Sequence, residues 1–158
     1  MEKKLTLTYQ TCSNLQELPE ADRALIRHAM ESSRNAYAPY SHFHVGACVR
    51  LQSGRMVDGN NQENASYPQG LCAERVALFS ASAHYPDETI EAIALFGADT
   101  RDFLTPCGGC RQVLLEYEQK QEKNIRVLMA KNNGEVIVIQ SVQDLLPFSF
   151  SQTDLNKQ

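Results

Sequence analysis

The chain has 158 residues, which is enough for a full hydrophobic core, and we expect a single domain over residues 1–158. Its hydrophobic content of 42% and charged content of 22% are those of an ordinary globular protein. The formal net charge of -4 and the lack of a basic cluster argue against a nucleic-acid partner. No apolar run approaches the roughly 20 residues that span a bilayer, so we expect no membrane partner. A small molecule is the expected partner.

The five cysteines indicate thiols that stay reduced. An odd number of cysteines, in a chain whose N-terminal residues show no apolar segment, is typical of a cytoplasmic protein with metal-ligating or buried thiols. We therefore expect a cytoplasmic location. Cys12 and Cys48 stand apart from the other three, and we predict ordinary thiols: Cys12 near the N-terminal end, and Cys48 packed inside a strand.

The first part of the chain predicts an arm followed by a helix. Leu5, Leu7 and Tyr9 alternate with polar residues, so residues 1–18 are expected to lie as an extended arm on the body. Acidic residues after Pro19 open a helix. Apolar side chains at helical spacing continue it to about residue 36, with one face on a sheet.

The rest of the chain alternates between apolar strands and helices. Helices that lie between strands require crossover connections and cover both faces of a sheet. The chain thus predicts an α/β fold, a three-layer α/β/α sandwich with four or five helices and a mixed sheet of about five strands. The predicted strands are 43–51, 55–59, 90–97, 125–130 and 136–141, the later helices include 72–83 and 110–117, and 151–158 form a C-terminal tail.

Two short stretches supply three thiols and one carboxylate that can converge. Cys72 stands two residues before Glu74, and Cys107 and Cys110 follow in a Pro-Cys-Gly-Gly-Cys stretch. This pattern is similar to the zinc deaminase signature, with Cys72 in the first ligand position. Three protein ligands leave the fourth tetrahedral position of zinc open for water, which is typical of a catalytic site. Glu74 is left free to move protons.

Three thiolates would put three negative charges around a dication, and this charge must be offset. The predicted helices place all three cysteines at helix N-termini, where backbone N–H groups and the helix dipole lower a thiol pKa. Arg75 follows the acid directly, and we predict that it donates to the cysteine sulfurs.

With these motifs in place, the chain resembles the cytidine deaminases of the small, homo-oligomeric type that acts on nucleosides. Cys-Ala-Glu-Arg alone would be a weak signal, and Pro-Cys-x-x-Cys alone fits any zinc knuckle. The polar loop before Cys72 makes the combination specific, and the similarity runs nearly end to end. The matching stretches are YAPYSHFHVGA (37–47), NQENASYPQGLCAER (61–75), PCGGCRQVL (106–114) and LLPFSF (145–150).

The resemblance implies a cytidine deaminase-like fold and one zinc ion per chain, bound by Cys72, Cys107 and Cys110. It also implies hydrolytic deamination of cytidine and 2'-deoxycytidine to uridine and 2'-deoxyuridine plus ammonia, a step of pyrimidine salvage. Glu74 would take a proton from water, pass it to N3 of the base, and deliver a second proton to the departing amino group.

The resemblance further implies contacts to the nucleoside. Asn61 and Glu63 correspond to residues that hydrogen-bond the ribose hydroxyls, and Phe43 to the aromatic residue that packs on the pyrimidine ring. The loop that contains Asn64, and backbone groups near Ala73, would hold the base edge in line.

Two aromatic positions look like residues that complete a site from neighbouring subunits, which implies a homotetramer. These are Tyr67 and the C-terminal Phe150. Phe148 adds a second aromatic residue in the same stretch, so the sequence leaves open which of the two reaches the neighbour.

Three alternatives are weighed against this interpretation. A deaminase of a modified nucleoside is disfavoured because the chain keeps the Asn-x-Glu-Asn-Ala stretch that reads ribose. A polynucleotide deaminase would need a basic channel. A structural zinc protein would need a fourth ligand, for which Cys48, His42 and His44 are the candidates, and it would have no use for Glu74. The preference between cytidine and 2'-deoxycytidine stays open.

Overall fold

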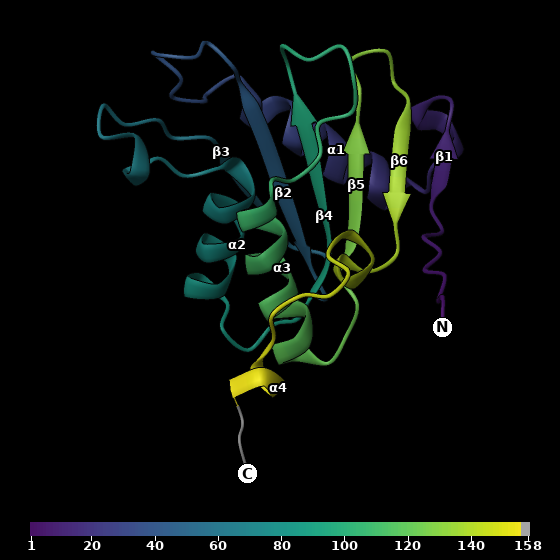
Figure 1. Cartoon of the computed structure of the whole chain (residues 1–158). Coiled ribbons are helices and arrows are strands. Elements are labelled where there is room, and N and C mark those ends of the chain that lie inside the picture. Colours follow the sequence, from purple (N-terminus) through teal and green to yellow (C-terminus); the bar gives the residue numbers. More distant parts are fainter. Residues whose placement is uncertain (156–158) are drawn as a thin grey trace.

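The centre of the fold is a mixed six-stranded sheet (Figure 1). A computed structural model describes residues 1–155 of the chain. The strands lie in the order β1-β6-β5-β4-β2-β3; β4 and β5 are parallel, and the other neighbouring pairs are antiparallel. The strands are β1 (Gln10–Cys12), β2 (Val45–Leu51), β3 (Met56–Asn60), β4 (Ile90–Gly97), β5 (Arg126–Ala130) and β6 (Val136–Ile139).

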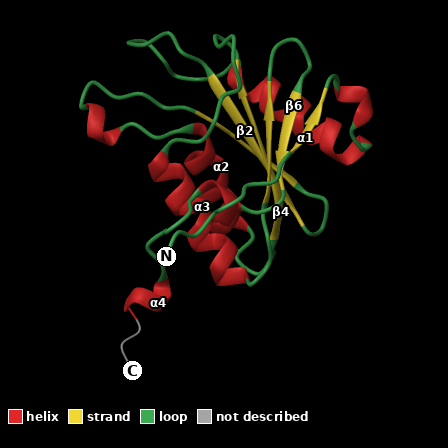
Figure 2. Ribbon diagram, turned by 45° about the vertical axis from the view of Figure 1, so that its right-hand side comes forward, coloured by secondary structure: helices red, strands yellow, loops and turns green. Residues whose placement is uncertain are grey.

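Helices cover both faces of the sheet, which confirms the predicted three-layer α/β/α sandwich. Helix α1 packs on one face, and α2 and α3 lie side by side on the other (Figure 2). Among the strand pairs within residues 1–155, β4 and β5 alone are parallel, and they are connected through α3. The helices are α1 (Glu20–Ser33), α2 (Ala73–His84), α3 (Gly108–Gln121) and the short α4 (Gln152–Leu155).

The sheet has six strands, and the prediction of about five is therefore wrong by one. The additional strand is β1, which pairs antiparallel with β6 at the edge of the sheet. Three residues are too few for an alternating apolar pattern to show in the sequence. The N-terminal arm joins the sheet through this main-chain pairing, and its alternating Leu5, Leu7 and Tyr9 are exposed.

Each face of the sheet has its own core, as the two-residue period of a strand requires. In β4, Ala92 and Ala94 pack toward α1, and Ile93 and Leu95 pack toward α2 and α3. Phe96 joins Ala92 and Ala94 on the α1 side, so a single strand contributes apolar side chains to both helical layers. This alternation explains why β4 reads as a continuous apolar run in the sequence.

Glycines allow both flanking layers to approach the sheet closely. A Cβ atom added at Gly59 of β3 would lie 2.3 Å from the backbone nitrogen of Ala77 in α2. A Cβ atom at Gly46 of β2 would lie 1.9 Å from the carbonyl oxygen of Ala29 in α1. Only glycine permits such contacts. The position of α2, whose first turn carries predicted site residues, is therefore set directly by the backbone of β3.

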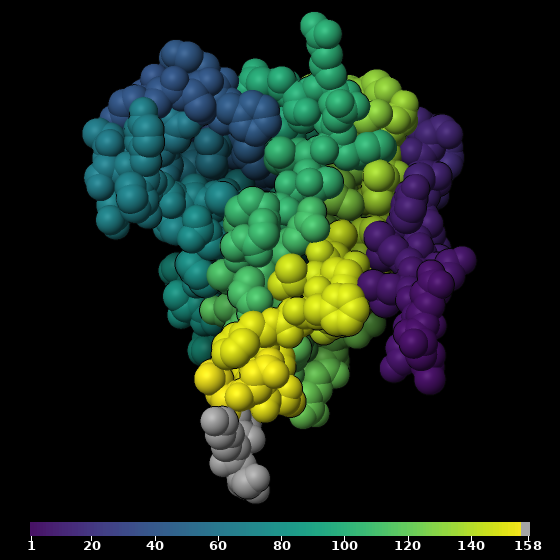
Figure 3. Space-filling model, viewed as in Figure 1, coloured from purple at the N-terminus to yellow at the C-terminus, as the bar shows by residue number. Residues whose placement is uncertain are grey.

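The C-terminal segment runs across the surface of α3 (Figure 3). Gln112 Nε2 donates to the carbonyl oxygen of Phe150 at 2.9 Å, and Gln152 Nε2 donates to Glu116 Oε1 at 2.8 Å. Of the predicted C-terminal tail, residues 156–158 lie outside the described residues. Among residues 1–155, no helix has both the length and the apolar character needed to cross a membrane.

Candidate active site

The three predicted ligand thiols converge where α2 and α3 begin. Cys72 and Cys107 are the N-caps of the two helices, and Cys110 lies in the first turn of α3, as the sequence predicts. Their sulfur atoms all lie within 4.8 Å of one another, and the Cys72 and Cys107 sulfurs are 4.0 Å apart. Sulfur ligands about 2.3 Å from a tetrahedral zinc ion are separated by roughly 3.8 Å. The trio therefore has the spacing of metal ligands.

The environment of the trio favours ionisation of Cys72. The pKa of this thiol is lowered to about 5 by the neighbouring Cys110 thiol, against the effect of burial, and further by Arg75. Arg75 Nη2 lies 3.8 Å from Cys72 Sγ. The pKa of Cys110 is raised because the Cys72 sulfur lies beside it and because it is buried. The helix N-termini and Arg75 thus favour the Cys72 thiolate, and the thiolate can bind a cation.

Glu74 is buried beside the thiols, in the first turn of α2. Its residue is 5% exposed, and burial raises the pKa of its carboxyl to about 7, with a further contribution from the Cys72 charge. The metal-ligating cluster contains only the three thiols and does not include Glu74. A carboxyl group with a pKa near neutral can both take up and release a proton at physiological pH.

Arg75 touches the cluster and keeps a free donor. Within residues 1–155, its Nε is the single buried side-chain nitrogen or oxygen without a hydrogen-bond partner. A buried donor without a partner is costly, and most such groups in proteins have one. At this position, next to Cys72, the free N–H marks a site that can accept further negative charge.

A cavity of about 470 Å³ opens beside Cys72 and is lined by the predicted substrate loop. Four of the predicted substrate contacts border it: Asn61, Glu63, Asn64 and Tyr67. The loop is tied back by paired backbone hydrogen bonds between residues 62 and 71, both 2.9 Å long. The polar loop and the first thiol therefore share one cavity.

Glu63 is held by the turn that precedes β2. Its carboxylate accepts hydrogen bonds from the backbone N–H groups of Tyr40 at 2.9 Å and Ser41 at 3.3 Å, and from the Ser41 hydroxyl. The Ser41 hydroxyl is the main cause of a lowered Glu63 pKa. Tyr40 and Ser41 also line the cavity, although the sequence analysis named neither. Both residues lie between Pro39 and Phe43, in a stretch that resembles the family, and this resemblance could have identified them as residues of the site.

Asn61 hydrogen-bonds the backbone at the start of β2. Its Oδ1 accepts from the backbone N–H of Val45 at 2.8 Å, and its Nδ2 donates to the carbonyl oxygen of Phe43 at 2.9 Å. These two bonds leave one N–H and one lone pair of the amide for another partner. Asn61 therefore has a structural task in addition to its place in the cavity wall.

Asn64 has a second role in the loop, whereas Phe43 and Ala73 belong to the core. Asn64 Oδ1 accepts from the backbone N–H of Ser66 at 2.8 Å, which shapes the loop. Phe43 is partly buried and packs against the core on the α2 and α3 face, and Ala73 is fully buried in that core. Neither Phe43 nor Ala73 belongs to the cavity lining.

Aromatic side chains surround the cavity mouth and the C-terminal segment. Tyr67 is 77% exposed and lies against Tyr40, with ring centroids 6.1 Å apart. Phe148 and Phe150 are 99% and 59% exposed, and neither lines the cavity of its own chain. Phe148 has a positive φ of 55°, an unusual backbone conformation for a bulky residue.

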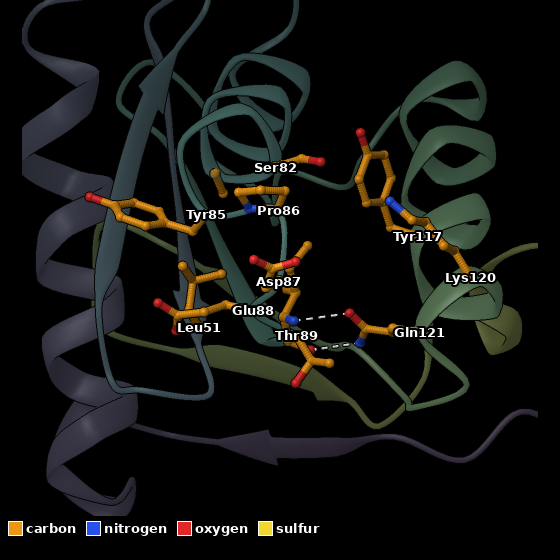
Figure 4. Close-up of a pocket in the computed structure, with 12 residues that line it drawn as sticks. Leu51, Ser82, Tyr85, Pro86, Asp87, Glu88, Thr89, Tyr117, Lys120 and Gln121 are labelled. Carbon is orange, nitrogen blue, oxygen red and sulfur yellow. Dashed lines mark hydrogen bonds between the residues drawn. The ribbon is translucent and has the colours of Figure 1, made fainter.

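A second cavity, of about 200 Å³, lies at the opposite ends of α2 and α3 (Figure 4). Side chains such as Tyr85, Asp87, Tyr117 and Lys120 line it, and it includes none of the predicted site residues. The chemistry predicted for the chain therefore belongs to the cavity beside Cys72.

The thiol trio has no fourth protein ligand in the part of the chain that the structure describes. The candidates were Cys48, His42 and His44, and none of them belongs to the trio's cluster. Cys48 is buried in the core on the α1 face, across the sheet from the thiols. An open ligand position beside a buried carboxyl is the arrangement of a catalytic metal site.

A three-layer α/β/α scaffold with three thiols and an acid at two helix N-termini defines a candidate metal-dependent enzyme. Residues 19–124 match the family model described as the cytidine and deoxycytidylate deaminase zinc-binding region. The chain belongs to this family of cytidine and deoxycytidylate deaminases.

Similar proteins cover most of the chain. It is 40% identical over 132 residues to a cytidine deaminase of Halalkalibacterium halodurans, which is 84% of this chain and 96% of that protein. It is 32% identical over 147 residues to a cytidine deaminase of Mycobacterium tuberculosis, covering 89% and 98% of the two chains. The crystal structure of a cytidine deaminase from Burkholderia pseudomallei superimposes with a TM-score of 0.73 at 43% identity, covering 80% and 97%. The predicted cytidine deaminase-like fold is confirmed.

Proposed function

We propose that this protein is a zinc-dependent cytidine deaminase that converts cytidine and 2'-deoxycytidine to uridine and 2'-deoxyuridine with release of ammonia, in pyrimidine salvage. The observation that carries the proposal is the convergence of three thiols and the buried Glu74 at the start of α2 and α3, next to the loop cavity. Family membership and relatives named cytidine deaminase support the same reaction.

The residues at the thiol trio fit one zinc ion per chain. Cys72, Cys107 and Cys110 would hold it, since their sulfurs have suitable spacing and soft thiolates suit zinc. The free Nε of Arg75 and the helix N-termini would balance the thiolate charge. When bound, zinc would supply a Lewis acid that makes a water molecule acidic near neutral pH.

Glu74 would carry the protons of the reaction. It takes one proton from the attacking water and passes it to N3 of the base, which makes C4 more electrophilic. Once the oxygen of that water has bonded to C4, Glu74 takes the remaining proton from this oxygen and gives it to the amino group. The C4–N bond then breaks, the C4 carbonyl forms and ammonia leaves. Burial supports this role because it raises the pKa of Glu74 to about 7, where the carboxyl exchanges protons readily.

The cavity loop would recognise the sugar. Glu63, held by the Tyr40–Ser41 turn, can accept from a ribose hydroxyl, and Asn61 has one free N–H for the same purpose. Phe43 would pack on the pyrimidine ring, while Asn64 and the backbone near Ala73 would hold the base edge. A free base leaves these sugar-directed groups without partners, and sites of this kind reject such analogues.

The family resemblance suggests a homotetramer, and exposed aromatic residues support sites that neighbouring subunits complete. Tyr67 stands at the cavity mouth, and Phe148 and Phe150 project from the C-terminal segment. Clustered exposed apolar side chains are typical of contact surfaces. We propose that a neighbour's Phe148 or Phe150 reaches the cavity. The five free thiols suit the reducing cytoplasm, which is the proposed location.

The decisive test is the loss of ultraviolet absorbance when zinc-replete protein is mixed with cytidine, 2'-deoxycytidine, cytosine or CMP. We expect turnover of both nucleosides and none of the free base. Turnover of cytosine at the same rate would contradict sugar recognition by Glu63. If protein that holds one zinc per chain turned over none of the four compounds, the proposed substrate would be contradicted.

A further inference from the structure

A second group of metal-ligating side chains lies on the face of the sheet opposite to the thiol trio. Cys48 in β2 and Asp58 in β3 are directly paired in the antiparallel register, so their side chains point to the same face. His28 reaches the same place from α1, with Nδ1 3.1 Å from Asp58 Oδ1 and 3.3 Å from Oδ2. One ligand atom of each residue lies within 4.8 Å of the others.

The three side chains differ in burial: the thiol is enclosed, and the other two ligands are about half exposed. Cys48 is fully buried and packs with the α1 core. The side chains of His28 and Asp58 are 47% and 48% exposed. An ion that binds here would separate the contact between His28 and Asp58 and bond to the sulfur beneath them.

We propose that His28, Cys48 and Asp58 form a second metal site that takes a divalent transition-metal ion of the zinc type. Imidazole, thiolate and carboxylate are the three ligand classes that zinc accepts in proteins. Ligands of a tetrahedral zinc ion lie roughly 3.3–3.8 Å apart, which small side-chain movements reach from the observed spacing. Magnesium and calcium prefer sets of oxygen ligands and do not suit this group.

The charges around the cluster are compatible with a dication. A thiolate and a carboxylate supply two negative charges, and neutral His28 adds none. Arg50, two residues along β2 from Cys48, is occupied by Asp22 at 2.9 Å and Glu91 at 3.1 Å. Without metal, burial and the nearby Asp58 raise the pKa of the Cys48 thiol well above its usual range. Binding thus breaks the S–H bond, forms a sulfur–metal bond and releases one proton to solvent.

A metal ion at this place would join three elements. It would tie α1 to the β2–β3 hairpin from the side opposite to α2, and so stabilise the fold without touching the thiol trio. The inference does not depend on the proposed deaminase function, because none of its three residues lies in the catalytic cavity.

The test counts bound metal in the zinc-replete protein by equilibrium dialysis against buffered free Zn²⁺. Cys48→Ser keeps the size of the side chain and removes the thiolate ligand, and His28→Asn removes the imidazole. The matched control is Cys12→Ser, because Cys12 is a free thiol in β1 outside both clusters. Thermal unfolding of each variant, with and without added Zn²⁺, gives a readout that catalysis does not affect.

We expect two zinc equivalents in the native protein and in Cys12→Ser, and one in Cys48→Ser and His28→Asn. Added Zn²⁺ should raise the Tm of the native protein and of Cys12→Ser more than that of the other two variants, since an ion that binds only the folded state stabilises it. Cytidine turnover should be the same in all four proteins. Saturation of the native protein at one equivalent, or two equivalents in Cys48→Ser, would overturn the proposal and leave His28 and Asp58 as a hydrogen-bonded pair.

Discussion

Replacement of Glu74 by glutamine removes the proposed proton carrier and keeps the shape of the side chain. The residue is only 5% exposed, so a neutral amide of equal size should disturb the packing little. General acid–base catalysis contributes about 10²–10⁴-fold to a rate, or roughly 3–5 kcal/mol of transition-state stabilisation. Because Glu74 moves two protons in one cycle, we expect kcat to fall by about 10⁴-fold, the upper end of this range.

The assay follows the absorbance of cytidine together with zinc content and thermal unfolding of the same preparation. Glu118→Gln is the matched control. Glu118 is also a buried glutamate, 7% exposed, and it accepts from the backbone N–H groups of Ile125 at 2.7 Å and Val142 at 2.8 Å. Its replacement should lower stability by about 1–3 kcal/mol and leave kcat unchanged. Full activity in Glu74→Gln with normal zinc content would refute the proton-carrier role.

The same residue sets the expected pH dependence. Below its pKa, Glu74 is protonated and cannot take a proton from water, so kcat/KM should decrease as the pH falls. Burial raises the pKa to about 7, and the positive charge of bound zinc would lower it again. We therefore expect an acid limb with a midpoint at or below about pH 7. Activity that rises on acidification through this range would contradict the assignment.

Three further substitutions test separate parts of the molecule. Cys107→Ala should lose both zinc and activity; zinc content equal to that of the native protein would exclude Cys107 as a ligand. Glu63→Ala should raise KM for cytidine by roughly 10–100-fold, from the loss of a charged hydrogen bond to the sugar, with a small change in Tm; an unchanged KM would make Glu63 a loop residue only. Asp22→Asn should lower the free energy of unfolding by about 3–5 kcal/mol, because Asp22 is a buried partner of Arg126 at 2.7 Å and Arg50 at 2.9 Å. Burial raises the pKa of Asp22, but hydrogen bonds from Arg126 and Arg50 outweigh it and lower the pKa overall. The ionised Asp22 carboxyl therefore stabilises the fold above its unfolded pKa, and this stabilisation is lost as the pH falls through the folded pKa. If the free energy of unfolding of Asp22→Asn, measured by chemical denaturation, fell equally steeply with decreasing pH, this account would be contradicted.

The sequence predicted the thiol trio because its geometry is mostly local. Cys72 and Glu74 are neighbours at the start of one helix, and Cys107 and Cys110 lie within one turn of another, so helix N-termini determine where these side chains point. Only the meeting of the two helices is a tertiary event, and the familiar spacing of the motifs indicated it. The strands with long apolar runs were predicted for a similar reason, since burial on both faces leaves a clear pattern.

Features that depend on distant contacts were not predicted. Strand β1 has three residues and forms only because β6 offers an open edge. The hydrogen bond from the Ser41 hydroxyl to Glu63 joins residues 22 positions apart, and it requires the folded turn before β2. The cluster of His28, Cys48 and Asp58 combines a helix and two strands: the register of β2 and β3 pairs Cys48 with Asp58, and the packing of α1 adds His28.

Metal removal and return test the central claim most directly. Protein stripped with a chelator is titrated with Zn²⁺, and cytidine turnover and bound zinc are measured at each step. We expect no turnover without metal, a linear rise up to the first bound equivalent, and no further change when more zinc binds. Full activity in metal-free protein, or no activity at one bound equivalent, would contradict a zinc-dependent cytidine deaminase.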